Sequence, residues 1–344
     1  NPIIPLAICA TMAPLVAVTG ASGFVGSHIV CELLQRGYRV RCPLRDPSND
    51  EKVAHLKAMA QNAPGSLTLT TGDLLEAGSY DDAFKGVDAV IHTAAVVEIL
   101  NVSDPQKDIV DPAVFGTRNV LDSVEKSSSV KTFVYTSTIL AIQSFEKAED
   151  YVFSEADWND WSSIERGDPY GYAKTEAEKL VHERSKGKSY SVRVINPGVV
   201  LGPVFCKAHT KASTVLVREL MYGNALNNYL SSFVDARDVA KAHAEALERP
   251  AAAGRRFLLV GEDGCMNTTD LGDVLARACP EYVVEAKAKY PPVLFGILSA
   301  LSQIPLLGGL VLTEFQRRVF QEPIEFDNDA AKEVLGIKFR PLEE

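Results

Sequence analysis

The chain has 344 residues and a formal net charge of −10, and its length suits one α/β domain with a smaller appended region. The negative charge argues against nucleic acid and against anionic membrane surfaces as partners. The six cysteines include no Cys-x-x-Cys pair, and the six histidines include no His-Glu-x-x-His motif. We therefore expect a reducing, cytoplasmic compartment and no metal site.

The first core element is expected to be a buried parallel strand at residues 15–19, after an N-terminal extension at 1–11. Three glycines with the spacing Gly-x-x-Gly-x-x-Gly follow it, and apolar residues at helical period then run over 24–36. Such glycines let backbone approach a phosphate, and the helix N-terminus supplies free N–H groups. An ordinary strand-to-helix turn is the alternative. The candidate cofactor residues are Gly20, Ser22, Gly23, Phe24, Val25 and Gly26.

The second strand, within residues 38–46, discriminates between the two nicotinamide dinucleotides. An acidic residue near the end of this strand would bond the ribose 2′-hydroxyl of NAD. Here Arg45 stands at the strand end and Lys52 follows in the next helix, and these cations suit a 2′-phosphate. NADP(H) is therefore the expected cofactor, although Asp46 beside Arg45 could present a carboxylate instead.

Two further strands are expected to bring cofactor contacts to the same edge of the sheet. The strand at 67–71 leads into Gly72-Asp-Leu, where Asp73 could bond the adenine amino group. The strand at 87–95 ends in small residues that would let a cofactor lie against backbone. Each segment alone is also compatible with sheet-edge packing. The candidate contacts are Asp73, Leu74, Thr93, Ala94 and Ala95.

A fifth strand at 131–138 ends in hydroxyl groups, and a later helix carries Tyr170 and Lys174 four positions apart. Residues at this spacing share a helix face, so the phenol and the ammonium can point into one cleft. We expect Lys174 to lower the pKa of Tyr170, which would donate a proton to a carbonyl oxygen as hydride arrives. Lys174 could also bond ribose hydroxyls. Ser137 or Thr138 could stabilise charge on that oxygen, unless they only pack the strand end.

These motifs resemble those of the extended short-chain dehydrogenase/reductases, in the branch with dihydroflavonol reductases, cinnamoyl-CoA reductases and fungal aldehyde or ketone reductases. The resemblance covers nearly everything after Met12 and implies an α/β Rossmann fold. This fold is a doubly wound parallel sheet with a smaller C-terminal substrate-binding region. The matching motifs lie at 19–26, 45–47, 72–74, 116–121, 133–138, 170–174, 196–203, 233–240 and 335–343.

The resemblance also implies roles for individual residues. Tyr170 and Lys174 match the catalytic tyrosine and lysine. Thr138 matches the catalytic serine, a departure that keeps the hydroxyl, and Ser137 is its alternative. Asn119 matches an asparagine that in relatives helps to hold the helix and a proton-relay water.

Cofactor contacts are implied in the same way. Arg45 and Lys52 match the residues that receive the 2′-phosphate in the dihydroflavonol reductase branch. The stretch at 167–172 departs from the usual cinnamoyl-CoA reductase sequence, so a CoA thioester substrate is doubtful. The loop that contacts the nicotinamide carboxamide is matched by Pro197, Gly198, Val199 and Val200.

The domain organisation follows from these assignments. Residues 12–195 are expected to form the NADP-binding domain, with 232–260 returning to it, and 196–231 and 261–344 to form the substrate-binding region. The segment 290–313 has no charged residue and is long enough to cross a bilayer. Proline and glycine interrupt it, so we favour a helix pair lining an apolar pocket over membrane association.

The expected function is NADPH-dependent reduction of an apolar ketone or aldehyde, dihydroflavonol-like or more general, to the alcohol. The alternative is an NAD-dependent dehydrogenase of 3β-hydroxysteroid type, with membrane attachment through 290–313. A non-catalytic dinucleotide sensor is disfavoured by the intact Tyr170/Lys174 pair. The expected partner is a small-molecule substrate, and the expected assembly is a monomer or a homodimer.

Overall fold

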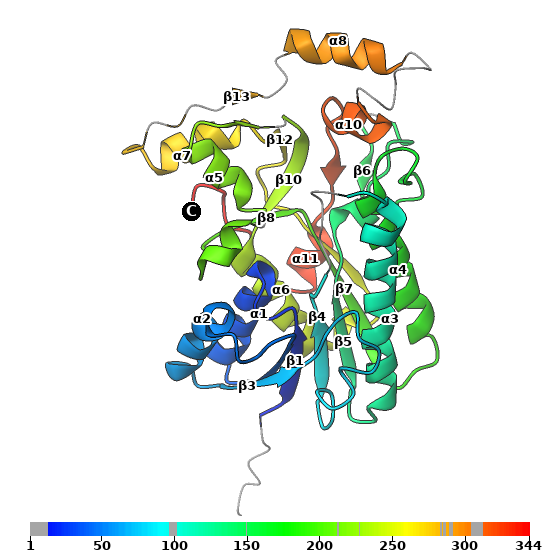
Figure 1. Ribbon diagram of the computed structural model, residues 1–344, viewed down its shortest axis with the longest axis vertical. Helices are drawn as coiled ribbons and strands as arrows, with labels where there is room; N and C mark the ends of the chain where they lie inside the picture. The colour runs from blue at the N-terminus through cyan, green and yellow to red at the C-terminus, as the bar shows by residue number, and fades with distance from the viewer. Residues whose placement is uncertain are drawn as a thin grey trace, which may run out of the picture.

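The computed structural model describes residues 13–95, 102–148, 150–211, 213–226, 228–282, 284, 287–288, 292–303 and 312–344. Its centre is a seven-stranded parallel sheet with the order β11-β7-β5-β4-β1-β2-β3 (Figure 1). This arrangement confirms the predicted doubly wound α/β fold. The strands are β1 (Leu15–Thr19), β2 (Arg39–Leu44), β3 (Ser66–Thr71), β4 (Ala89–His92), β5 (Thr132–Thr136), β7 (Ser191–Pro197) and β11 (Arg256–Leu259).

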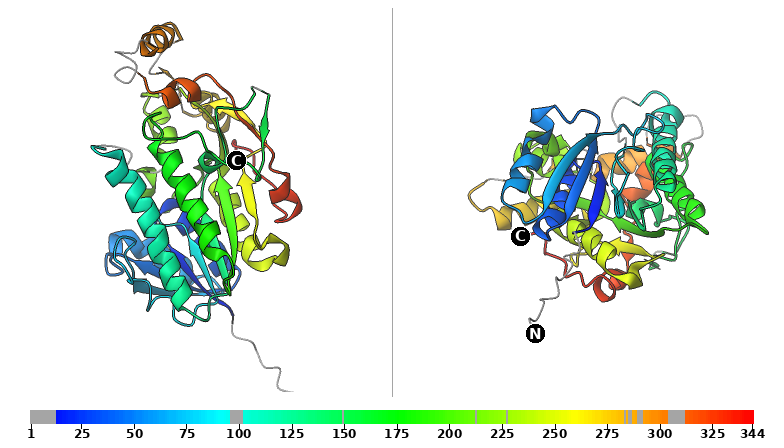
Figure 2. Two further views of the ribbon diagram at one scale, coloured as in Figure 1. Left: turned by 90° about the vertical axis from the view of Figure 1, so that its right-hand side faces the viewer. Right: turned by 90° about the horizontal axis from the view of Figure 1, so that it is seen from below.

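Helices cover both faces of this sheet. Helices α1, α2 and α6 pack together on one face, and α3 packs beside α4 on the other (Figure 2). The five helices are α1 (Phe24–Gln35), α2 (Asp50–Gln61), α3 (Asp111–Lys126), α4 (Pro169–Ser185) and α6 (Ala236–Glu248).

The sequence of each strand reflects its place in the sheet. All five residues of β1 are buried, as expected for a central parallel strand that is covered on both faces. Successive side chains alternate between faces, so Val16 and Val18 pack towards α1 while Leu15 and Ala17 pack towards α3. Edge strand β3 instead alternates exposed and half-buried residues.

A smaller three-stranded sheet with the order β12-β10-β8 adjoins the large one. Residues 232–260 were expected to return to the cofactor-binding domain. The strand at 230–235 belongs instead to the small sheet, whereas α6 packs on α1 and β11 joins the seven-stranded sheet. The division into cofactor and substrate domains remains a prediction. The three strands are β8 (Val199–Leu201), β10 (Leu230–Asp235) and β12 (Cys265–Asn267).

Short elements complete the described chain. They include the π-helix η1 (Gln106–Val110) and the 3-10 helices η2 (Ile139–Ala141), η3 (Lys207–Lys211) and η4 (Pro250–Ala252). The short strands are β6 (Val152–Phe153), β9 (Ala225–Leu226), β13 (Lys287–Ala288) and β14 (Glu325–Phe326). The short helices are α5 (Val215–Met221), α7 (Leu271–Ala278), α8 (Pro292–Ser302), α10 (Glu314–Val319) and α11 (Asp329–Glu333).

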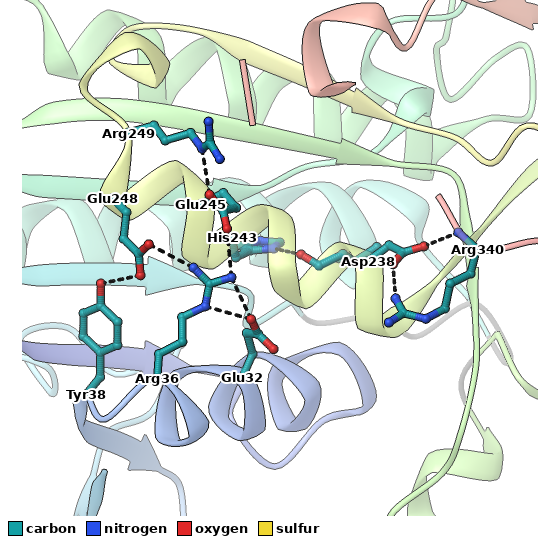
Figure 3. Close-up of polar contacts among 10 residues, drawn as sticks. Glu32, Arg36, Tyr38, Asp238, His243, Glu245, Glu248, Arg249 and Arg340 are labelled. Atoms are coloured by element: carbon teal, nitrogen blue, oxygen red, sulfur yellow. Dashed lines mark hydrogen bonds and ion pairs between the residues drawn. The ribbon is translucent and has the colours of Figure 1, made fainter. Parts of the chain in front are cut away.

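A partly exposed polar network joins α6 to α1 (Figure 3). Arg36 donates to Glu32 at 2.8 Å and to Glu245 and Glu248 at 3.0 Å each. At the other end of α6, the backbone N–H of Arg340 donates to Asp238 at 2.7 Å, and its guanidinium bonds the same carboxylate. The network therefore ties the C-terminal segment and α1 to one helix of the core.

The uncharged segment 290–313 lies partly outside the described residues. Its described part contains α8, which exposes 78% of Val293 and 55% of Ile297 and stands away from the sheet (Figure 1). The expectation that this segment forms a helix pair lining an apolar pocket stays a prediction, because much of it lies outside the described residues. Among the described helices, none has the length and apolar character needed to cross a membrane.

Candidate functional site

The structure brings the predicted site segments to one edge of the seven-stranded sheet, where its parallel strands end. The sheet order changes direction between β1 and β4, and such a switch point is where this fold binds ligands. The candidates at this edge are Gly20–Gly26 after β1, Arg45 after β2, Asp73 and Leu74 after β3, Thr93–Ala95 after β4, Ser137 and Thr138 after β5, and Pro197–Val200 at the end of β7.

The glycine loop is built for close backbone approach. Gly20 has φ +70°, and a Cβ there would lie 2.7 Å from the backbone nitrogen of Ala94, which belongs to the segment after β4. Gly26 lets α1 start tightly, because its Cβ would collide with the Gly20 carbonyl oxygen. Gly23 caps α1 with no side-chain hydrogen bond from the described residues. The first-turn N–H groups can therefore meet a phosphate, as a dinucleotide site requires.

The end of β2 presents two cations and a restrained carboxylate. The exposed side chains of Arg45 and Lys52 make no hydrogen bond or ion pair within the described part of the chain. Asp46 accepts from the Ser48 hydroxyl at 2.6 Å and from its backbone N–H at 3.0 Å. These bonds lower the pKa of Asp46 and hold its carboxylate in the turn. The free cations fit a 2′-phosphate better than the held carboxylate fits a ribose hydroxyl.

The loop after β3 is fixed by a buried amide. Asn119 on α3 donates to the carbonyls of Leu74 at 3.2 Å and Glu76 at 2.7 Å, and it accepts from the Gly78 N–H at 2.9 Å. Asp73 accepts from the Leu75 N–H at 2.9 Å, and its predicted adenine contact stays a prediction. Among the described residues, the side-chain hydrogen bonds of Asn119 are thus all with this loop, and the role implied by the resemblance stays a prediction.

The ends of β4 and β7 place small or buried residues at the same edge. The Ala94 N–H donates to the Thr19 hydroxyl at 3.4 Å, and the same hydroxyl lies 2.7 Å from His92 Nδ1. Gly198 donates to the Leu259 carbonyl at 2.9 Å, and a Cβ there would collide with the Ser232 carbonyl. The backbone at 197–200 can therefore pass closely from the large sheet to the small one.

The first turn of α4 is held by a buried chain of hydrogen bonds. Asp168 caps the helix and accepts from the Gly171 N–H at 2.9 Å and from the Ser162 hydroxyl at 2.5 Å. Asn159 donates to Ser162 at 2.7 Å. Tyr170 is the second residue of this helix and is partly exposed. No hydrogen bond of its hydroxyl is found among the described residues, so the phenol can serve a ligand.

Tyr170 and Lys174 do not have the expected electrostatic relation. Burial raises the pKa of Tyr170 to about 12, and the nearby charge of Asp168 acts in the same direction. The buried ammonium of Lys174 donates to the Thr136 carbonyl at 2.9 Å and lies 5.1 Å from the centre of the Tyr135 ring. The expected lowering of the Tyr170 pKa is therefore wrong for this structure, because burial dominates and Lys174 is directed to the end of β5. Burial also lowers the pKa of Lys174 to about 8, against the charge of Glu178.

The two hydroxyls after β5 have different surroundings. The Ser137 hydroxyl is buried near Glu178 and finds no partner of good geometry among the described residues. Thr138 accepts from the Leu140 N–H at 3.3 Å, a long bond, and its carbonyl accepts from Asn196 at 3.1 Å. The Thr138 hydroxyl donates no hydrogen bond to a described residue, and the role that the resemblance implies for it stays a prediction.

A buried ion pair beneath α4 was not predicted from the sequence. Arg256 on β11 donates to Glu178 at 2.5 Å, and their side chains are 6% and 0% exposed. Asn196 donates to the second oxygen of Glu178 at 2.8 Å. Glu178 follows Lys174 by one helical turn, so an acidic residue on the inner face of α4 was the available sequence signal.

The sequence profile of the NAD dependent epimerase/dehydratase family matches residues 16–261. The chain belongs to this family. Cinnamoyl-CoA reductase 1 of Oryza sativa subsp. japonica is 33% identical over 95% of this chain and 87% of its own length. Dihydroflavonol 4-reductase of Arabidopsis thaliana is 34% identical over 78% of this chain and 70% of its own length.

A solved structure supports the same placement. Gre2 from Candida albicans in complex with NADPH superposes with a TM-score of 0.77, at 25% identity over 96% of this chain and 95% of that one. The chain is thus an oxidoreductase of the extended short-chain dehydrogenase/reductase type, as predicted from its motifs.

Proposed function

We propose that this protein reduces an apolar ketone or aldehyde to the alcohol with NADPH, and that Tyr170 donates the proton. The observation that carries this proposal is the position of Tyr170 and Lys174 on the first two turns of α4. There they share a sheet edge with a glycine loop and two unpaired cations. A reducing site needs these parts together, because hydride and proton must reach the two ends of one carbonyl group.

NADP(H) is the cofactor that the residues fit. The glycine loop and the uncapped α1 N-terminus would hold the pyrophosphate, and Arg45 with Lys52 the 2′-phosphate. Asp50 and Glu51 place two negative charges in the first turn of α2, so the N-terminus of this helix would not attract a phosphate. The side chains of Arg45 and Lys52 would therefore bind the 2′-phosphate. When bound, NADPH would supply the hydride for the carbonyl carbon.

The protonation of the free site suits reduction. With a pKa of about 12, Tyr170 keeps its proton at neutral pH and can donate it to the carbonyl oxygen. With a pKa of about 8, Lys174 is mostly an ammonium at pH 7 and would bond the nicotinamide ribose hydroxyls. Thr138 would donate a further hydrogen bond to the same carbonyl oxygen.

The substrate class is supported by an aromatic cluster that lies just before α4 in the sequence and includes a residue of α10. Phe145 and Trp161 pack with their ring centres 4.9 Å apart just before this helix. Phe315 on α10 lies 6.3 Å from Phe145, and its N–H donates to the Arg166 carbonyl at 2.9 Å. The C-terminal region therefore adds apolar surface beside the catalytic turn. The steroid-type alternative with NAD is not proposed, because Asp46 is held by Ser48.

The test is a fluorescence titration of the purified protein with NADPH and with NADH, followed by a panel of ketones and aldehydes. We expect NADPH to bind at least roughly tenfold more tightly, the smallest gain that a charge-assisted contact would give. We also expect loss of NADPH absorbance with aromatic or branched carbonyls. A preference for NADH without carbonyl turnover would overturn the proposal.

A further inference from the structure

Three side chains that are far apart in the sequence meet beside the glycine loop. His55 lies on α2, while Cys206 and His209 lie three positions apart before and within η3. One nitrogen of each ring and the Cys206 sulfur all lie within 4.8 Å of one another. Neither a Cys-x-x-Cys nor a His-His pattern marks this cluster, which is why the sequence was expected to hold no metal.

The two imidazole rings are held in place by α1 and the glycine loop. His55 Nε2 lies 2.8 Å from the Ser27 hydroxyl oxygen, and His209 Nε2 lies 3.4 Å from the same atom. Ser27 donates its own hydrogen to the Ala21 carbonyl at 3.0 Å. His209 Nε2 also lies 3.2 Å from the Ser22 carbonyl oxygen. Both rings therefore converge on one hydroxyl. His209 Nδ1 also accepts from the Phe205 N–H at 3.3 Å, so a metal bond to either nitrogen of His209 would replace one of these contacts.

One polar atom of this cluster is left without a partner. His55 Nδ1 is buried and makes no hydrogen bond with any described residue. A buried ring nitrogen without a partner is costly, and a metal ion would supply the partner that His55 Nδ1 lacks.

We propose that His55, Cys206 and His209 form a binding site for a zinc-type divalent ion. Two imidazoles and a thiolate are typical zinc ligands, and the fourth position would be left to water or to the Ser27 hydroxyl. Zinc bonds of about 2.0–2.3 Å place tetrahedral ligand atoms roughly 3.3–3.8 Å apart. The side chains would therefore close by about 1 Å on binding, which partly exposed His55 and Cys206 allow.

The bound ion would connect three parts of the protein. The cluster joins α2, which follows the Arg45 turn, to the segment at 206–209 across the start of α1. Because the ligands come from segments about 150 residues apart, binding would stabilise the folded state over the unfolded chain. This proposal concerns the protein without its dinucleotide and is independent of the proposed reaction.

The experiment is a zinc titration of the full chain after chelator treatment, under reducing conditions and against a chromophoric chelator. We expect one ion per chain, a rise in the thermal midpoint and, with Co²⁺, a thiolate charge-transfer band. Cys206→Ser and His55→Gln should each weaken zinc binding at least roughly tenfold and abolish the rise in the midpoint. Cys206→Ser should also remove the Co²⁺ band.

Cys279→Ser is the matched control, because Cys279 is also a half-buried free thiol but lies outside the cluster. It should bind zinc like the parent and keep the Co²⁺ band. Absence of stoichiometric binding, or equal affinity in Cys206→Ser and the parent, would overturn the proposal. A band that survives in Cys206→Ser and disappears in Cys279→Ser would do the same.

Discussion

The two ends of the candidate site treat charge in opposite ways. At the cofactor end, Arg45 and Lys52 are exposed and unpaired within the described chain, and α1 begins without a side-chain cap. At the catalytic end, Asp168, Lys174 and Glu178 are all buried, and each is hydrogen-bonded to a defined partner. Both ends lie along one edge of the same sheet.

This contrast follows from what each end must meet. A charged cofactor brings its own counter-charge. An exposed, hydrated cation at its site therefore costs the free protein little stability before the cofactor binds. A proton donor must instead stand in position before the substrate arrives, and that requires neighbours fixed by packing and hydrogen bonds. Buried charges that provide such positioning are tolerated only when they are paired.

The largest expected effect lies at the catalytic end. Replacing the proton donor by Tyr170→Phe should lower kcat by roughly 10³–10⁴-fold, or about 4–5.5 kcal/mol, and leave NADPH affinity nearly unchanged. The matched control is Tyr172→Phe on the same helix, which should keep most activity. Steady-state kinetics and a fluorescence titration measure both quantities. Full activity in Tyr170→Phe would rule out the assigned role.

The second effect tests whether the catalytic end depends on its buried pair. Arg256→Met leaves Glu178 buried and unpaired and should lower the free energy of unfolding by about 3–5 kcal/mol. Arg36→Met removes three ion pairs from the partly exposed network of Figure 3 and should cost only about 1 kcal/mol. Urea unfolding compares the two variants, and equal losses would refute the distinction.

The third effect belongs to the cofactor end. Arg45→Ala should weaken NADPH binding by roughly 1.5–3 kcal/mol, about 10–150-fold, while NADH binding changes little. Arg39→Ala is the control, since Arg39 begins the same strand at the opposite edge and bonds the Ala13 carbonyl. If both nucleotides weaken equally in Arg45→Ala, the 2′-phosphate role is excluded.

Sequence patterns predicted the local features of this protein well. Strand β1 and the start of α1 lie where the apolar run and the glycine spacing placed them, because short-range periodicity and turn chemistry determine such elements. The position of Arg45 at the end of β2 also followed from counting along one strand.

Long-range relations were not accessible in this way. The bond between Glu178 and Arg256 joins residues 78 positions apart, and the His55/Cys206/His209 cluster joins three separate segments. The raised pKa of Tyr170 depends on burial that a helical spacing of four residues does not reveal. Local pattern thus fixed which residues reach the site edge, whereas their electrostatics required the packed fold.

The smallest expected effect is a change in the free energy of unfolding, and it concerns the buried charge of Lys174. The pKa of Lys174 is lowered from 10.5 to about 8, so between these pH values the unfolded chain binds the extra proton and stability rises with pH. Below pH 8 the buried ammonium costs at most about 3 kcal/mol, which the bond to the Thr136 carbonyl partly offsets. Lys174→Met should therefore raise the free energy of unfolding at pH 7 by roughly 1–2 kcal/mol while it impairs turnover.

The same variant should lose its stability advantage as the pH approaches 10.5, where the parent lysine becomes neutral in both states. Urea unfolding of both proteins at pH 7 and pH 10 measures this change. A variant that is less stable than the parent at pH 7 would show that the ammonium is held by the fold at no cost. In that case the buried charge of Lys174 would not lower the stability of the fold. The buried and the exposed cations of the site would then not differ in their stability cost.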